Sequence, residues 1–194
     1  MAKIGFIGMG NMGSAIMSGL LKRYKPEDMV FTAAHAEKME RVTERTGVPH
    51  AASNKDCASR VKYLVLAVKP QYFEAVFADI RDVLRPDQVI ISLAPGLTIQ
   101  SYKERLGADK RFVRAMPNTP ALLGEGMTGV SYESGLFDEE EKAEIGAIFA
   151  SCGKVQMVEE RLMDAVGCVS GSSPAFVYMF SMQLADGAVK YGLP

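Results

Sequence analysis

The chain has 194 residues, enough for one substantial domain and part of a second. Hydrophobic residues make up 48% of it and charged residues 23%, so it can bury a core. The net charge of -1 provides no field that would attract nucleic acid or an anionic membrane, and neither partner is expected. Three scattered cysteines and two histidines predict a cytoplasmic protein without a metal centre.

Short apolar runs alternate with amphipathic runs along the first two thirds of the chain. The apolar runs predict buried strands at Ile4–Ile7, Met29–Thr32, Tyr63–Val68, Val89–Leu93 and Phe112–Met116. The amphipathic runs predict helices at Asn11–Leu21, Glu37–Thr46, Tyr72–Leu84 and Ile99–Leu106. This β-α-β-α order predicts an α/β fold with a Rossmann-type, doubly wound and mainly parallel sheet.

An acidic first turn followed by an apolar face predicts a further helix within Phe137–Gly153, and Lys154–Val158 has the pattern of a last strand. From about Glu159 the composition changes to small apolar residues, methionine and aromatic residues. We therefore expect a dinucleotide-binding domain over residues 1–159.

The remaining residues, 160–194, predict the start of an all-helical oligomerisation domain. Two helices are expected here, broken at Gly171–Ser173, with Ser173 as the N-cap and Pro174 at the first helical position. The segment Ala175–Val189 is so apolar that it must be buried on nearly all sides. The chain has nothing left to bury it, which predicts either a truncated chain or a partner.

A glycine turn with the pattern Gly8-x-Gly10-x-x-Gly13 separates the first predicted strand from the first predicted helix. Gly8 permits the tight turn, Gly10 lets the backbone approach a pyrophosphate, and Gly13 lets the helix pack closely on the strand. The helix N-terminus then favours the phosphate. A glycine-rich turn without a ligand is the alternative.

The end of the second predicted strand indicates which dinucleotide is bound. NAD enzymes place an acidic residue here for the ribose 2′-hydroxyl, but Thr32–Ala36 contains none. NADPH is therefore favoured, with NADH possible. His35 and Lys38 can approach a 2′-phosphate, although this stretch supplies no arginine, and a solvated loop position for His35 is an equal alternative.

Three further motifs accompany the turn: "LAVKP" at Leu66–Pro70, "RAMPNTP" at Arg114–Pro120 and "DAVGCVSGSSPAF" at Asp164–Phe176. Together, in this order, the four motifs resemble the pyrroline-5-carboxylate reductase family. The resemblance implies NAD(P)H-dependent reduction of L-1-pyrroline-5-carboxylate to L-proline, the last step of proline biosynthesis. A small imino acid is then the substrate, and the protein is a homodimer or larger homo-oligomer through its C-terminal helices.

The resemblance also implies where the ligands bind. The cofactor-binding residues are Ile7, Gly8, Met9, Gly10, Asn11 and Met12 at the pyrophosphate, His35 and Asn54 at the adenosine end, and Ala67, Val68, Lys69, Pro70, Leu93, Ala94 and Pro95 at the nicotinamide side. Asn118 is expected to orient the nicotinamide amide, with fixing of its own loop as the alternative.

Ser172 and Ser173 are expected to bind the substrate carboxylate at a helix N-terminus, with plain N-capping as the alternative. No residue is assigned as the catalytic proton donor, which the resemblance places beyond Pro194. Pro95 departs from the alanine that is usual in the family and removes one backbone donor.

Two other functions remain as alternatives. The opening "GFIGMGNMG" also resembles the β-hydroxyacid dehydrogenases, but the region after the nucleotide domain holds no lysine before Lys190 to abstract a proton. A non-catalytic NADP-binding or assembly domain is the second alternative, and it predicts cofactor binding without turnover.

Overall fold

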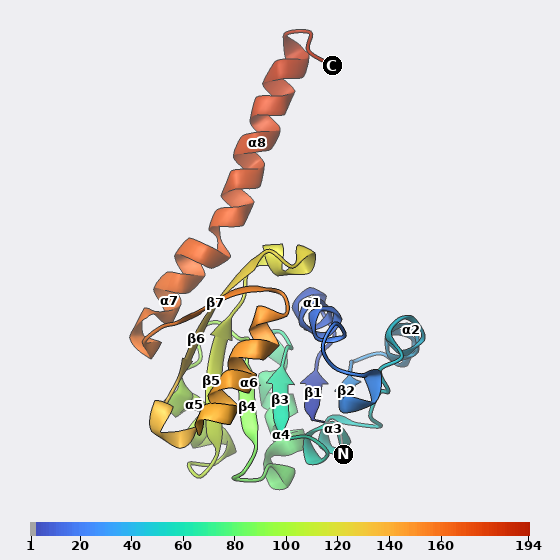
Figure 1. Ribbon diagram of the computed structural model, residues 1–194, viewed down its shortest axis with the longest axis vertical. Helices are drawn as coiled ribbons and strands as arrows, with labels where there is room; N and C mark the ends of the chain where they lie inside the picture. Colours follow the sequence, from blue (N-terminus) through green and yellow to red (C-terminus); the bar gives the residue numbers. More distant parts are fainter. Residues whose placement is uncertain (1–2) are drawn as a thin grey trace.

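A seven-stranded sheet forms the centre of the computed structural model, which describes residues 3–194 (Figure 1). The strands are β1 (Ile4–Ile7), β2 (Met29–Thr32), β3 (Tyr63–Leu66), β4 (Val89–Ser92), β5 (Arg111–Met116), β6 (Gly126–Tyr132) and β7 (Gly153–Met157). Their order is β2-β1-β3-β4-β5-β6-β7. The first five strands are parallel, β6 runs antiparallel to β5, and β7 is parallel to β6. The predicted mainly parallel, doubly wound sheet is confirmed.

Helices cover both faces of this sheet. They are α1 (Asn11–Leu20), α2 (Ala36–Thr46), α3 (Asn54–Ser59), α4 (Phe73–Ile80), α5 (Ile99–Leu106) and α6 (Glu139–Ala150). Two more helices, α7 (Met163–Val166) and α8 (Ser173–Lys190), follow β7. Side chains of α1, α2 and α6 share one apolar core with the sheet. Side chains of α3, α4 and α5 share the other. Because β1 to β4 are buried on both faces, they are uninterrupted apolar runs in the sequence.

Two elements of the structure, α3 and β6, were not predicted from the sequence. Helix α3 is short, and its first turn is capped by Ser53, whose hydroxyl accepts the Asp56 N–H at 3.0 Å. Strand β6 contains two glycines, which weaken any strand signal. A Cβ on Gly129 would lie 2.8 Å from Val166 Cγ1, so this glycine is what lets α7 pack against β6.

The C-terminal segment changes from one helix to the next at the predicted place, since α8 begins at Ser173, but the N-cap is Ser172 and not Ser173 as predicted. One π-helical turn (Gly167–Gly171) joins α7 to α8, and Ser172 has right-handed helical backbone angles without a capping side chain. Pro174 lies in the first turn of α8 and has no N–H, so the wider π-helical turn accommodates it without ending the helix.

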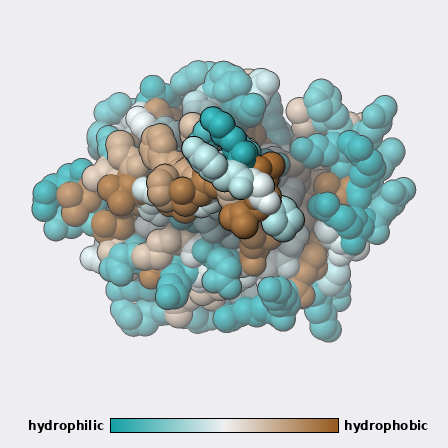
Figure 2. Space-filling model, turned by 90° about the horizontal axis from the view of Figure 1, so that it is seen from above, coloured by the Kyte–Doolittle hydropathy of each residue, from teal (hydrophilic) through white to brown (hydrophobic). Residues whose placement is uncertain are grey.

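Helix α8 projects away from the sheet and carries the chain's C-terminus at its far end (Figure 1). None of its side chains is buried, so the burial that its composition requires is not provided within the chain. Seen from above, apolar side chains gather on and beside this helix, with hydrophilic residues around them (Figure 2). No helix among residues 3–194 is both long and apolar enough to cross a membrane.

Helix α6 is linked to the amino-terminal ends of strands β3 and β5 by its buried Glu141. Glu141 accepts a hydrogen bond from Arg111 Nη1 at 2.7 Å and lies 2.9 Å from Lys62 Nζ. Asp138 caps the same helix, since its carboxylate accepts the Glu141 N–H at 2.8 Å. These contacts join α6 to β5 and to the start of β3 across the sheet edge.

We predict that Glu141→Gln destabilises the protein in a pH-dependent way. Burial raises the pKa of Glu141, but hydrogen bonds from Arg111 and Lys62 outweigh it and hold the pKa below its ordinary value. The Glu141 carboxylate therefore stabilises the fold above pH 4.5, and this contribution is lost as the pH falls through the lowered value. At neutral pH the variant should lose about 1–3 kcal/mol in urea unfolding.

The difference in free energy of unfolding between Glu141→Gln and the unsubstituted protein should shrink towards zero in acid. Glu139→Gln on the same helix is the matched control, because that side chain is 90% exposed and should contribute little. A Glu141→Gln deficit that stays constant from neutral to acid pH would contradict this account.

Candidate dinucleotide and substrate site

The predicted motifs meet at one edge of the sheet. Strands β1, β3, β4 and β5 are parallel, so their carboxyl ends lie side by side. The glycine turn follows β1, the "AVKP" segment follows β3, Leu93–Pro95 follows β4, and the "PNTP" segment follows β5. Open α/β sheets bind their ligands at this edge.

The glycine turn has the geometry that its spacing predicts. Gly8 has a φ of 99°, and a Cβ there would lie 2.7 Å from the Ala67 carbonyl oxygen. A Cβ on Gly13 would lie 2.5 Å from the Gly8 carbonyl oxygen. Around Gly10, by contrast, a Cβ would meet no atom within 4 Å. Gly8 and Gly13 are therefore required by the fold, whereas Gly10 leaves open space above the turn.

The N-terminus of α1 is available to an anion. Gly10 is its N-cap, no side chain caps it, and its first turn holds no acidic residue. The first backbone N–H groups and the helix dipole therefore point at the open space beside Gly10. Of the side chains predicted here, Met9 is buried in the core and Met12 packs against it, so these two can contribute only backbone atoms. Asn11 is exposed.

A groove of about 370 Å³ begins at this turn and is cationic. Its lining residues are Met9, Gly10, Asn11, Ser14, Lys38, Arg41, Val42 and Arg45. Lys38 was predicted, but Arg41 and Arg45 were missed because they lie on α2, beyond the stretch that directly follows β2. Their spacing of three and four residues along α2 was the available signal. His35 starts α2 as its N-cap, is exposed, and is not among the lining residues.

A second groove, of about 240 Å³, lies on the other side of the same turn. Asn54 lines it with its amide already oriented: Thr32 Oγ1 donates to Asn54 Oδ1 at 2.7 Å, and Asn54 Nδ2 donates to Asp79 Oδ2 at 2.9 Å. Tyr72 and Val68 also line the groove. Asp79 and Tyr72 were missed because they lie outside the motifs, Asp79 on α4 and Tyr72 just before it.

The predicted nicotinamide side has few free backbone donors. The N–H of Ala67 bonds the Ile7 carbonyl at 2.8 Å, and that of Leu93 bonds the Leu66 carbonyl at 3.1 Å. The N–H of Ala94 bonds Ser92 Oγ at 3.2 Å, and Pro95 has none. These segments therefore present side chains and carbonyl oxygens to the edge. Lys69 and Pro70 are exposed there.

Asn118 joins the loop after β5 to the C-terminal helices. Its Oδ1 accepts the Met127 N–H at 2.8 Å, while its Nδ2 lies 3.2 Å from both the carbonyl oxygen and Oγ of Ser170. Pro174 has no N–H to offer the Ser170 carbonyl four residues earlier, and Asn118 donates to that carbonyl instead. This geometry supports the loop-fixing alternative for Asn118.

The two serines predicted for the substrate are exposed at the π-to-α junction. The Ser172 N–H bonds the Val169 carbonyl, and Ser172 Oγ donates to the Gly167 carbonyl at 3.4 Å. Ser173 is the first residue of α8. Their backbone is therefore part of a continuous helical path, and the predicted free N-terminus at this point does not exist. Among residues 3–194 no cluster of three His, Cys, Asp or Glu is placed to hold a metal ion.

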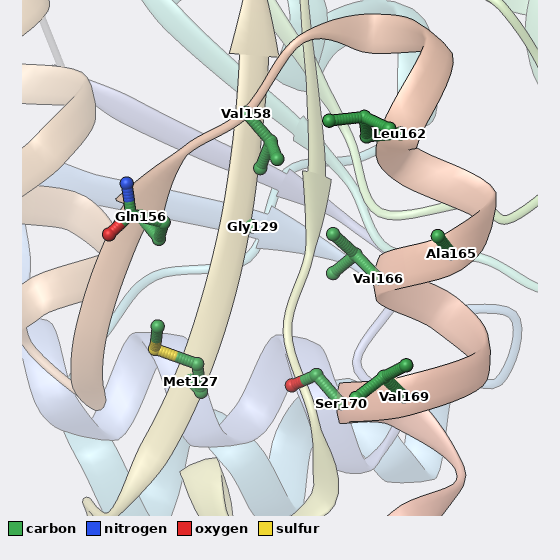
Figure 3. Close-up of a pocket in the computed structure, with 9 residues that line it drawn as sticks. All are labelled: Met127, Gly129, Gln156, Val158, Leu162, Ala165, Val166, Val169 and Ser170. Carbon is green, nitrogen blue, oxygen red and sulfur yellow. The ribbon is translucent and has the colours of Figure 1, made fainter.

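An apolar groove of about 330 Å³ lies farther along the sheet, between α7 with its π-helical turn and strands β6 and β7 (Figure 3). Leu162, Val166 and Val169 face Met127 and Val158 across it. Its polar lining side chains are Gln156 and Ser170. Its lining shares no residue with the phosphate-binding turn, and more than half of it comes from the segment between Leu162 and Ser170 that leads into α8.

The fold and the glycine turn together define a dinucleotide-binding α/β protein of the oxidoreductase type. Comparison with known proteins gives the family. Residues 3–96 match the family model described as "NADP oxidoreductase coenzyme F420-dependent". Residues 160–194 match the model described as "Pyrroline-5-carboxylate reductase dimerisation".

The chain is 37% identical over 194 residues to the pyrroline-5-carboxylate reductase of Escherichia coli, covering 99% of this chain and 72% of that protein. The solved pyrroline-5-carboxylate reductase of Coxiella burnetii superimposes with a TM-score of 0.91 at 32% identity, over 100% of this chain and 72% of that one. The Plasmodium falciparum pyrroline carboxylate reductase, solved with NADP bound, superimposes with a TM-score of 0.88 at 32% identity, over 100% of this chain and 71% of that one. The chain belongs to the pyrroline-5-carboxylate reductase family.

We predict that Gly10→Ala separates ligand binding from stability. Gly10 has ordinary backbone angles, φ -73° and ψ -169°, and the space above it is empty. The free energy of unfolding should therefore change by no more than about 0.5 kcal/mol. The added methyl group should weaken NADPH or NADH about tenfold or more in calorimetric titration, because it occupies the approach of the pyrophosphate.

Gly8→Ala is the contrasting variant. Its left-handed φ and the 2.7 Å approach to Ala67 should destabilise the fold by about 1–3 kcal/mol. Equal dinucleotide affinity in Gly10→Ala and the unsubstituted protein would refute the placement of the pyrophosphate.

Proposed function

We propose that this protein reduces L-1-pyrroline-5-carboxylate to L-proline, with NADPH as hydride donor. The observation that carries the proposal is that three of the four family motifs meet at one sheet edge, where the uncapped N-terminus of α1 faces open space beside Gly10. The fourth motif reaches them through Ser170, which contacts Asn118. The relatives named above support the same reaction.

The residues present fit a dinucleotide. The N–H groups at the start of α1 would hold its pyrophosphate, and the groove lined by Asn54, Val68 and Tyr72 would hold the adenosine end. The nicotinamide end would then reach Ala67–Pro70 and Leu93–Pro95 at the ends of β3 and β4. When bound, the reduced nicotinamide supplies a hydride to an electrophilic carbon.

The protein's own part in the reaction is mainly positioning. Reduction of the protonated imine forms one C–H bond at the imine carbon and leaves the nitrogen as an amine, so little further proton transfer is required. The site must keep the imine carbon at contact distance from the dinucleotide and fix the substrate carboxylate. We propose that the hydroxyls of Ser172 and Ser173, exposed at the start of α8, bind this carboxylate.

Cofactor preference follows from the cationic groove. Lys38, Arg41 and Arg45 would meet the 2′-phosphate of NADPH beyond the end of β2, where no acidic residue opposes it. Among residues 3–194 neither arginine forms an ion pair, so both remain available to a phosphate. The predicted phosphate contact is thus extended from Lys38 to the arginines of α2, and His35 is less well placed for it.

We predict that the unsubstituted protein oxidises NADPH faster than NADH with pyrroline-5-carboxylate, followed by loss of the nicotinamide absorbance. Arg41→Ala should raise KM for NADPH about tenfold and leave that for NADH unchanged, because it removes one charge-assisted contact to the phosphate. Arg23→Ala, an exposed arginine outside the groove, is the control. NADPH binding without turnover would instead favour a non-catalytic dinucleotide-binding domain.

We propose that the chain divides near residues 159 and 160 into a nucleotide-binding domain and a helical domain that joins two or more copies. The match of residues 160–194 to the dimerisation model supports homo-oligomerisation. The exposed apolar side chains of α8 and the adjacent groove supply the surface that a second copy would bury. A reducing cytosol suits the three free cysteines.

We predict that Phe180→Glu converts the oligomer to a monomer in sedimentation velocity experiments. Phe180 is 67% exposed on α8 in the single chain, and a charge there would be buried unpaired in an interface between copies. Ser134→Glu, at an exposed position outside the helical segment, is the control for added charge. An unchanged sedimentation coefficient in Phe180→Glu would exclude this part of α8 from the interface.

A further inference from the structure

Arg114 is a charged side chain inside the sheet whose role the reaction does not explain. It lies on β5, three residues before Pro117, and is the first residue of the "RAMPNTP" motif. Its side chain is 4% exposed, and it is the one lysine or arginine that is buried among residues 3–194. A buried basic residue in the middle of a strand is uncommon unless it is paired.

The partners of Arg114 come from segments distant in the sequence. Its Nη1 lies 3.1 Å from Glu160 Oε1, and its Nη2 lies 3.6 Å from Asp164 Oδ1. Glu160 Oε1 also accepts the N–H of Ile99, the first residue of α5, at 2.6 Å. The Glu160 carboxylate therefore joins three parts of the molecule: strand β5, the N-terminus of α5 and the start of the C-terminal helical segment.

Stability alone does not account for this arrangement. Arg114 Nε is buried without a hydrogen-bond partner, which is a cost to the folded state. Asp164 is 83% exposed, so its attraction is weakened by solvent. An apolar side chain of similar volume would avoid the cost of burying the charge. The guanidinium is therefore better explained by the geometry that it imposes on Glu160.

Both segments that Glu160 joins lead to the site. The loop before α5 contains Leu93–Pro95, and Ser92 at its start holds the loop through Ala94, whose N–H bonds Ser92 Oγ at 3.2 Å. In the other direction, Glu160 leads through α7 to Ser170, which contacts Asn118. The two grooves assigned to the adenosine end lie near the ends of β1 and β2, beside α2 and α4, whereas this junction lies farther along the sheet at β5 and α5.

We propose that Arg114 is a positioning residue that acts through Glu160. By holding this carboxylate against the N-terminus of α5, it sets the distance between the loop after β4 and the helical segment, and so fixes the nicotinamide end of the cofactor. The adenosine end does not depend on it. This inference rests on the proposed function.

The test compares two ligands in calorimetric titration: NADPH, and adenosine 2′,5′-bisphosphate, which lacks the nicotinamide half. Arg114→Met should weaken NADPH about tenfold while the affinity for the fragment stays within about twofold. Glu160→Gln should act in the same direction, and it keeps an oxygen for the Ile99 N–H if Arg114→Met does not fold. Arg114→Lys retains a cation without the planar guanidinium, so its affinity for NADPH should lie between those of Arg114→Met and the unsubstituted protein.

The neighbouring exposed ion pair between Arg161 and Glu159 provides matched controls. Arg161→Met and Glu159→Gln should bind both ligands as the unsubstituted protein does. Equal weakening of NADPH and fragment in Arg114→Met and Glu160→Gln would show a merely structural role and overturn the proposal, as would no weakening of either. If the unsubstituted protein binds the fragment no more weakly than NADPH, the proposed placement of the nicotinamide fails, and the proposal with it.

Discussion

The close packing of the β1–α1 turn against the end of β3 is the constraint on which the site depends. Gly8 can take its left-handed conformation 2.7 Å from the Ala67 carbonyl only because it has no side chain, and Gly13 lets α1 lie directly over the turn. Together they aim the uncapped N-terminus of α1 at the sheet edge. Both grooves of the adenosine end open from this turn, so their position follows from it.

The second half of the site depends on a proline and an asparagine that are far apart in the sequence. Pro174 leaves the Ser170 carbonyl without a helical donor, and Asn118 supplies one from the loop after β5. The result is a continuous helix held against the sheet by a polar contact at its π-helical turn. Arg114 and Glu160 make the second such connection, at the start of the same helical segment.

Much of the site could be predicted because its chemistry is local in sequence. A strand, a glycine turn and a helix specify a phosphate-binding edge by spacing alone, and the motifs after β3 and β5 lie at that edge because parallel strands end together. Arg41, Asp79 and Tyr72 could not be found in this way, because they lie outside the motifs: Arg41 on α2, Asp79 on α4 and Tyr72 just before α4. Strand β6 was missed since its two glycines serve packing with neighbours.

The sequence by itself determined the class of fold, the phosphate-binding turn and the family, because each depends on short apolar periods and on residues at fixed spacing. Only the tertiary structure decided how the C-terminal helices continue through Ser172, what Asn118 contacts and why Arg114 is charged. The contacts of Asn118 and Arg114 join groups that are 52 and 46 residues apart in the sequence. Such pairings arise from packing, which periodicity along the chain does not encode.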